Sequence, residues 1–232
     1  MNDNLLKAIE VKYKQQGENP ETYLQGLLHA KPITYWDYIG VETLLSLQHP
    51  RTEFRDEPIF IMYHQVTELV LKMLLHELTA LVETTEITDT DIQLRVSRMN
   101  RYTSMLIQTF DIMSEGMDYD QYNQFRMSLA PASGFQSAQF RYVELYATGL
   151  ENLINSAGKA RLPENPQITD LMNQLYWKDA GTCRHSGHQS VTLSQFEKKY
   201  KAQFTEIATE FRGKTLEDRV MAMNLSQESK DV

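Results

Sequence analysis

Apolar residues recur at steps of three and four along residues 58–84, and this pattern restricts the fold more than any other feature of the chain. Such spacing places the apolar side chains on one face of a helix. Pro58 suits the first turn of that helix, because its missing N–H would be unpaired there in any case. A second helix is predicted over residues 90–114, with Thr88 or Thr90 as its N-cap. The apolar residues of the first helix are Ile59, Phe60, Met62, Val66, Leu69, Val70, Met73, Leu74, Leu78 and Leu81.

Glycine and proline are scarce, at 10 and 7 of 232 residues, which favours long helices with few turns. We predict an all-α fold, a helical bundle, formed by a single domain over residues 1–232. Residues 1–33 are expected to be an N-terminal arm that takes part in oligomer contacts. Further helices are predicted over residues 1–16, 35–48, 118–129, 137–156, 168–178 and 192–212, and about the last fifteen residues are predicted to fray.

Charge, hydropathy and cysteine content exclude several classes of protein. The net charge is −8 and the pI is about 5.3, which argues against sequence-independent nucleic-acid binding because that needs clustered Lys and Arg. No run approaches 18 consecutive apolar residues, so no membrane span is expected. The polar first residues lack the apolar core of a signal peptide. Cys183 is the single cysteine, which fits a reducing compartment and predicts a cytoplasmic protein.

Two pairs of residues at a spacing of four are candidate site residues. Phe60 and His64 fall on one helix face, where an aromatic ring can flank a flat ligand while the imidazole hydrogen-bonds or moves a proton. The competing interpretation is a core histidine bonded to a nearby carbonyl, and the spacing alone favours it. Tyr122 and Arg126 suit an amino-acid carboxylate, since a guanidinium presents a fork of donors. Here the competing interpretation is a surface arginine packed over a tyrosine.

Three further segments contain candidate functional residues. Residues 133–141 (SGFQSAQFR) put Gly and Ser at a helix start, which either binds an anion or is an ordinary N-cap. Residues 34–39 (TYWDYI) are dense in aromatic side chains and predict a pocket wall, a subunit interface or internal packing. Residues 183–188 (CRHSGH) combine one Cys with two His, but this spacing fits no standard zinc pattern and lacks the C-x-x-C-H run of covalent haem attachment.

Three blocks of the sequence, in order, resemble signature blocks of the tryptophan 2,3-dioxygenase family. They are TYWDYIGVETLLSLQHP, FIMYHQVTELVLKMLLHEL and QYNQFRMSLAPASGFQSAQFRYVEL, and the resemblance is specific over roughly residues 34–146. It implies an all-α homotetramer that opens the indole 2,3-bond of L-tryptophan with O2 on the iron of haem b, giving N-formylkynurenine. The protein is then expected to be an oxidoreductase of tryptophan catabolism in the kynurenine pathway.

The same resemblance implies roles for individual residues. His64 matches the distal-pocket histidine that meets the indole N–H and is the expected catalytic residue. Phe60 matches the aromatic residue beside the substrate ring. Arg126 matches the residue that grips the substrate carboxylate, and Tyr122 matches its hydroxyl partner. The residues that match those lent to the pocket of a neighbouring subunit are Tyr35, Tyr38 and Ile39.

The residue that would hold the haem iron is not evident from the sequence. The family carries this histidine on a long helix near the C-terminus, followed by a loop rich in Gly, Ser and Thr, and the chain shows neither after Leu193. His185 and His188 are the candidates for a substitute axial ligand. Two alternatives therefore stay open: a non-catalytic relative that keeps the indole amino-acid pocket without functional haem, and a helical scaffold protein.

Overall fold

The computed structural model describes residues 3–129, 134–183 and 187–223. Within these residues the regular structure is helical, and β-pairing is limited to one isolated bridge between Thr182 and Gln189. The all-α prediction is therefore confirmed. Among the described helices, none is long and apolar enough to cross a membrane.

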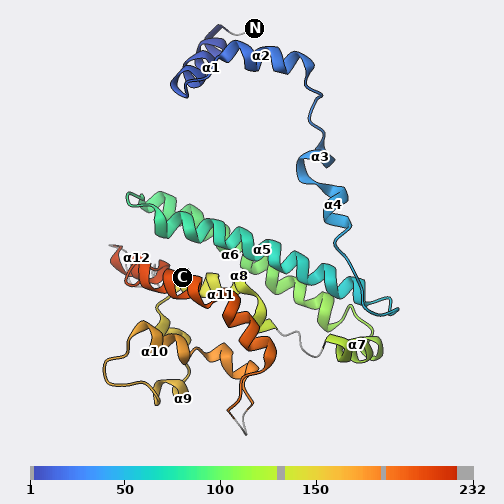
Figure 1. Cartoon of the computed structure of the whole chain (residues 1–232), viewed down its shortest axis with the longest axis vertical. Coiled ribbons are helices and arrows are strands. Elements are labelled where there is room, and N and C mark those ends of the chain that lie inside the picture. Colours follow the sequence, from blue (N-terminus) through green and yellow to red (C-terminus); the bar gives the residue numbers. More distant parts are fainter. Residues whose placement is uncertain (1–2, 130–133, 184–186, 224–232) are drawn as a thin grey trace. The chain divides into compact units, whose positions relative to one another are not determined.

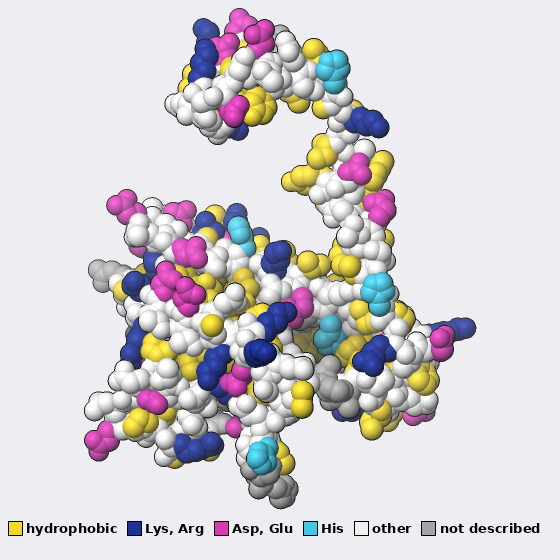
Figure 2. All heavy atoms as spheres, in the orientation of Figure 1, with side chains coloured by type: hydrophobic (Ala, Val, Ile, Leu, Met, Phe, Trp, Pro, Cys, Tyr) yellow, Lys and Arg dark blue, Asp and Glu magenta, His cyan; other side chains and the backbone are white. Residues whose placement is uncertain are grey.

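The chain divides into two compact units, residues 1–48 and 49–232. In the first unit α1 and α2 pack against each other, and the rings of Tyr13 and Tyr23 stack with their centroids 4.3 Å apart. Apolar side chains lie exposed over this unit (Figure 2). The unit ends later than the predicted arm of residues 1–33, and oligomer contacts of the arm stay a prediction. Its described helices are α1 (Asp3–Gln15), α2 (Pro20–His29), α3 (Tyr35–Ile39) and α4 (Val41–Leu45).

The second unit is built on two long helices, α5 (Glu57–Glu83) and α6 (Asp89–Ser114), which lie side by side (Figure 1). Helix α8 (Ala138–Ala147) packs on α5, α11 (Val191–Glu210) packs on α8, and α12 (Leu216–Ala222) contacts both α5 and α8. The remaining elements are α7 (Tyr119–Arg126), η1 (Met127–Leu129), η2 (Gly134–Gln136), η3 (Leu150–Leu153), α9 (Ser156–Lys159), α10 (Ile168–Asn173) and η4 (Tyr176–Gly181).

Two clusters of buried apolar side chains hold the second unit together. One lies among α5, α6, α8 and α12 and includes Leu74 and Leu81. The other lies among α8, α10 and α11 and includes Leu171 and Phe204. Tyr142 of α8 packs against both, so α8 joins the α5–α6 pair to the C-terminal helices. Burying a leucine or phenylalanine side chain stabilises a fold by roughly 1.5–3 kcal/mol, so these clusters are the main source of stability.

Two predicted helices are shorter in the structure because the backbone leaves the helical region. The predicted helix over residues 35–48 is broken at Gly40, which adopts φ 62° and ends α3 where α4 begins. Glycine has no Cβ and reaches this left-handed conformation without steric cost. The predicted helix over residues 137–156 ends at Ala147, because Thr148 is extended and its hydroxyl donates to a carboxylate of α12. Residue spacing carries no sign of this tertiary contact.

Residues 168–223 differ from the sequence prediction in two places, and residues 224–232, the rest of the segment predicted to fray, lie outside the described residues. The predicted helix over residues 168–178 ends at Asn173, and the chain then continues into the 3-10 helix η4. The expected fraying is wrong for α12, which has a reciprocal capping box at its start. The Thr215 hydroxyl oxygen accepts from the N–H of Asp218, and the Asp218 carboxylate accepts from the N–H of Thr215. This arrangement satisfies two backbone donors and favours a helix even in a short segment.

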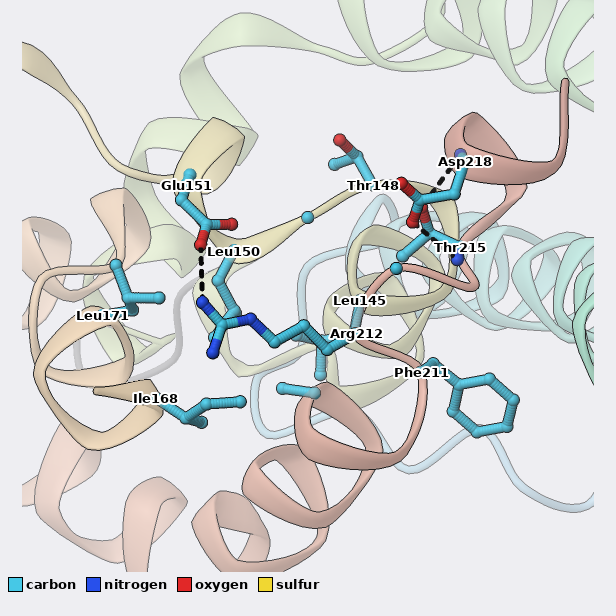
Figure 3. Close-up of a pocket in the computed structure, with 13 residues that line it drawn as sticks. Leu145, Thr148, Leu150, Glu151, Ile168, Leu171, Phe211, Arg212, Thr215 and Asp218 are labelled. Carbon is cyan, nitrogen blue, oxygen red and sulfur yellow. Dashed lines mark hydrogen bonds and ion pairs between the residues drawn. The ribbon is translucent and has the colours of Figure 1, made fainter. Parts of the chain in front are cut away.

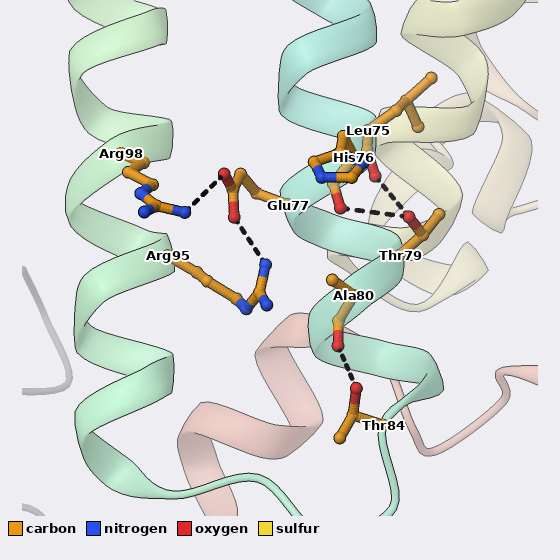
Figure 4. Close-up of polar contacts among 8 residues, drawn as sticks. All are labelled: Leu75, His76, Glu77, Thr79, Ala80, Thr84, Arg95 and Arg98. Carbon is orange, nitrogen blue, oxygen red and sulfur yellow. Dashed lines mark hydrogen bonds and ion pairs between the residues drawn. The ribbon is translucent and has the colours of Figure 1, made fainter. Parts of the chain in front are cut away.

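A buried carboxylate connects the two long helices. Glu77 of α5 is 4% exposed and lies between two arginines of α6 (Figure 4). Its Oε2 accepts from Arg95 Nη1 at 2.8 Å, and its Oε1 accepts from Arg98 Nη1 at 3.3 Å. A buried carboxylate is costly unless it is paired and hydrogen-bonded. The two arginines therefore fix which face of α6 meets α5.

We expect Glu77→Gln to lower the free energy of unfolding by about 1–3 kcal/mol, since it removes the buried negative charge and turns an NH2 donor toward one of the two arginines. Arg98→Gln is the matched control. The Arg98 side chain is 46% exposed, so its loss should cost less than about 1 kcal/mol. Urea denaturation of both variants measures the difference. Equal losses, or no loss in Glu77→Gln, would contradict the assignment.

Candidate functional site

The N-terminus of α5 is anchored by a buried glutamate. Glu57 is 1% exposed, and its carboxylate accepts from the N–H groups of Arg51 and Thr52, each at 2.8 Å, and from the Thr52 hydroxyl. Burial alone raises the pKa of Glu57, but these hydrogen bonds and the nearby Arg51 charge outweigh it and hold the pKa below its ordinary value. The loop before α5 is thereby folded back onto the first turn.

A second anchor joins the start of α5 to the start of α7. Asp56 is the N-cap residue of α5, and its Oδ2 accepts from the N–H of Asp118 at 2.7 Å. Asp118 is in turn the N-cap of α7, where its Oδ1 accepts from the N–H of Gln121 at 2.9 Å. The two helices that carry the predicted site residues therefore begin at one hydrogen-bonded point.

Aromatic rings fill the space between α5 and α7. Phe125 is fully buried, and its ring meets those of Phe60 and Tyr122 edge-on with centroid distances of 5.6 Å in both cases. The rings of Phe60 and Tyr122 are themselves 6.1 Å apart. Edge-to-face contacts of this kind stabilise aromatic pairs beyond their buried area. The structure thus brings together the two pairs of candidate residues, which lie far apart in the sequence.

One ring nitrogen of His64 is hydrogen-bonded within α5, and the other is available to a ligand. Its Nδ1 lies 2.8 Å from the carbonyl oxygen of Phe60, one turn earlier in α5. A carbonyl only accepts, so Nδ1 carries the proton, and in the neutral ring Nε2 is an acceptor. The ring lies 4.2 Å from that of Phe60, and Tyr63 meets it edge-on at 5.1 Å. The carbonyl bond of the competing interpretation is present, but the side chain is exposed and does not belong to the core.

Arg126 ends α7 with its guanidinium at the surface. Its central carbon lies 5.4 Å from the centre of the Tyr122 ring, a cation–π distance. Among the described residues, no carboxylate lies within ion-pair distance of this guanidinium. An exposed guanidinium without an internal anion keeps its donors available to a ligand carboxylate.

Helix α8 is connected to α5 close to His64. The Ser137 hydroxyl oxygen accepts from the N–H of Phe140 at 3.2 Å, so the N-cap interpretation of this segment is confirmed for Ser137. Gln139 Nε2 donates to the carbonyl of Glu68 at 2.7 Å and to its carboxylate at 2.8 Å. Glu68 lies one turn after His64, so α8 holds the segment of α5 that carries the imidazole. Ser133 lies outside the described residues.

The other predicted site residues are not joined to this group. Tyr35, Tyr38 and Ile39 lie on α3 of the first unit, with exposed fractions of 73%, 77% and 45%, and their part in a pocket stays a prediction. His188 is exposed in the loop closed by the Thr182–Gln189 bridge. His185 lies outside the described residues. No group of three or more potential metal ligands occurs in the part of the chain that the structure describes.

Two residues of this group, Phe125 and Tyr63, are not indicated by the sequence pattern. Phe125 follows Tyr122 by three residues, a spacing that puts both on one side of a helix, but α7 was too short for a clear periodic pattern. Tyr63 precedes His64 directly, and neighbouring positions on a helix usually face different ways. The residue spacing therefore does not predict the edge-on contact of Tyr63 with the imidazole.

The fold and the site define an all-helical protein with aromatic, imidazole and guanidinium groups gathered at the start of two anchored helices. The family model for tryptophan 2,3-dioxygenase matches residues 25–230. The chain belongs to the tryptophan 2,3-dioxygenase family, which confirms the resemblance seen in the sequence.

Curated relatives agree with this assignment. The chain is 34% identical to tryptophan 2,3-dioxygenase of Cupriavidus necator over 164 residues, covering 70% of this chain and 54% of the relative. It is 35% identical to that of Bacillus thuringiensis over 136 residues, which cover 57% of this chain and 48% of the relative. It is 37% identical to that of Erythrobacter litoralis over 121 residues, which cover 52% of this chain and 46% of the relative. The chain thus spans about half the length of these relatives.

The lowered pKa of Glu57 predicts a specific acid sensitivity. Its stabilising effect is fully present above the ordinary value of 4.5 and is lost as the pH falls through the lower folded-state pKa. Glu57→Gln should therefore be less stable than wild type at pH 7, and the gap should narrow below pH 4.5. Urea denaturation across this range measures it, with Glu53→Gln in the same loop as control. A gap that does not change with pH would contradict the assignment.

Proposed function

We propose that the protein opens the indole 2,3-bond of L-tryptophan with O2, giving N-formylkynurenine, and that the amino acid binds at the α5–α7 site. This site consists of Phe60, His64, Tyr122, Phe125 and Arg126. The observation that carries the proposal is the proximity of an imidazole acceptor, aromatic rings and an available guanidinium on two helices that share one anchor. Family membership supports the reaction.

Each group matches one part of an indole amino acid. The Arg126 guanidinium binds the carboxylate through a fork of charge-assisted hydrogen bonds. Phe60 and Tyr122 offer ring faces and edges to the indole, and the buried Phe125 holds both rings in place. His64 Nε2 accepts from the indole N–H, because Nδ1 is fixed as the donor to Phe60. His64 orients the substrate in this proposal and is not required to remove a proton.

Haem b is the cofactor that the family resemblance implies, and the described residues do not fit it. His64 faces the proposed substrate through Nε2, and His188 is exposed in a loop. A cavity of about 480 Å³ lies among α5, α6, α8 and α12, and none of its described lining residues is a histidine. Neither His64, nor His188, nor any described residue that lines this cavity is therefore placed to hold the iron.

Two alternatives to catalysis are distinguished by simple observations. A non-catalytic relative would bind tryptophan without functional haem, and a sharp Soret band that moves with L-tryptophan after haemin addition would exclude it. A helical scaffold protein would use the exposed side chains of the first unit for assembly.

We further propose a cytoplasmic homo-oligomer, a tetramer by family resemblance, in which Tyr35, Tyr38 and Ile39 reach a neighbouring site. Their large exposed fractions support this.

Arg126→Gln is expected to weaken binding of L-tryptophan by about tenfold to a hundredfold, because a charge-assisted contact to the carboxylate is lost. Tryptamine lacks the carboxylate, so its affinity should not fall. Isothermal titration of both ligands measures this, and Arg101→Gln removes an exposed arginine elsewhere as the control. A scaffold protein would show no tryptophan binding, and an equal loss for tryptamine would show that Arg126 does not bind the carboxylate.

A further inference from the structure

Asp56 begins α5 without capping it. Its backbone is helical, with φ −83° and ψ −14°, and its carboxylate makes no hydrogen bond to the first turn of α5. An N-cap aspartate normally has an extended backbone and accepts from an N–H two or three residues later, which stabilises the helix that it begins. Thr215 and Asp218, which line a pocket beside α12, show the ordinary arrangement, because each side chain accepts from a backbone N–H of that same helix start (Figure 3). The Asp56 carboxylate instead accepts from the N–H of Asp118, at the start of a different helix.

This hydrogen bond is the polar attachment of α7. No other hydrogen bond or ion pair among the described residues connects residues 118–126 to another α-helix. The ring contacts with α5 lie toward the other end of the helix, where Phe60 meets Tyr122 and the fully buried Phe125. Helix α7 has eight residues and is about 12 Å long. Asp118 and Phe125 therefore hold it at opposite ends.

The two attachments constrain α7 in different ways. Apolar burial is non-directional, so by itself it would let the helix tilt about the buried Phe125 ring. The hydrogen bond at Asp118 is directional and removes this freedom. Arg126 follows Phe125 directly, and Tyr122 lies one turn before Arg126 on the same face, so the direction of both side chains depends on where the start of α7 is held. A guanidinium needs a defined orientation to bind a carboxylate through two parallel hydrogen bonds.

We propose that Asp56 is a positioning residue that sets Arg126 against His64, and that it thereby makes the α5–α7 site prefer indole compounds that carry a carboxylate. The inference rests on the proposed function and deepens it. In this arrangement L-tryptophan meets both helices, with its indole N–H at His64 on α5 and its carboxylate at Arg126 on α7. Tryptamine has the same indole and no carboxylate, so its binding depends less on the position of α7. Asp56 acts through Arg126 and does not itself bind the substrate.

The charge of Asp56 has an effect of the opposite sign, which separates it from positioning. A carboxylate at the start of α5 repels a ligand carboxylate, so removal of the charge alone would tighten tryptophan binding. Loss of the attachment would weaken it. Asp56→Asn removes the charge but keeps an amide oxygen that can accept from the N–H of Asp118, whereas Asp56→Ala removes both.

Isothermal titration of the full chain with L-tryptophan and with tryptamine tests the proposal. Asp56→Ala should weaken tryptophan binding about fivefold and change tryptamine binding by less than about twofold. Asp56→Asn should keep at least about half of the wild-type affinity for tryptophan. In an Arg126→Gln background, Asp56→Ala should change tryptophan affinity by less than about twofold, because the contact that it positions is already lost. Asp89→Ala removes an exposed carboxylate at the start of α6 and should change neither affinity.

A measurement without ligand reports the position of α7 itself. The centroids of the Phe60 and Tyr122 rings lie 6.1 Å apart, so their ring protons should give NOE contacts in the wild-type protein. These contacts should weaken in Asp56→Ala and persist in Asp56→Asn. The hydrogen bond between Asp56 and Asp118 is exposed, so both variants should keep the wild-type melting temperature.

The outcomes separate this inference from the proposed function. Wild-type protein that binds no tryptophan would overturn both. If wild type binds tryptophan, three results overturn the positioning role alone: unchanged tryptophan affinity in Asp56→Ala, an equal loss in Asp56→Asn, or an equal loss for tryptamine. A loss in Asp56→Ala that persists undiminished in the Arg126→Gln background would also overturn it, because Asp56 would then act through another residue.

Discussion

Burial of the second half of α5 is the constraint on which the rest of the second unit depends. From Val70 to Val82 this helix buries apolar side chains against α6, α8 and α12, and the buried Glu77 fixes its pairing with α6. Between Pro58 and Leu69 no residue of α5 is fully buried. One helix thus has two parts: its second half forms the core, and its first half carries the side chains proposed to meet a ligand.

Placement of the site follows from contacts at both ends of that exposed half. Asp56 holds the start of α7, which carries Tyr122 and Arg126, and Gln139 holds Glu68 one turn beyond His64. The Phe125 ring fills the space between the helices. The side chains proposed to meet the substrate are therefore exposed or partly exposed, while the residues that position them are hydrogen-bonded or buried.

Much of this arrangement was predictable from the sequence, for physical reasons. The apolar period defined α5 and α6 to within a residue or two because long amphipathic helices repeat the same signal many times. The motif blocks identified the family and the pairs Phe60–His64 and Tyr122–Arg126. Helix α8 ends at Ala147 because of a tertiary contact, and α12 forms with the help of its capping box. Neither feature can be predicted from the spacing of apolar residues. Phe125 was missed because α7 is short.

Isotope-filtered NOE spectroscopy with L-tryptophan would show whether the α5–α7 site holds an indole amino acid. We expect contacts from the indole protons to the rings of Phe60 and Tyr122, and an indole N–H signal that shifts back toward its free position in His64→Leu. Tryptophan that shows no contact with these rings, or an indole N–H signal that His64→Leu leaves unchanged, would contradict this prediction.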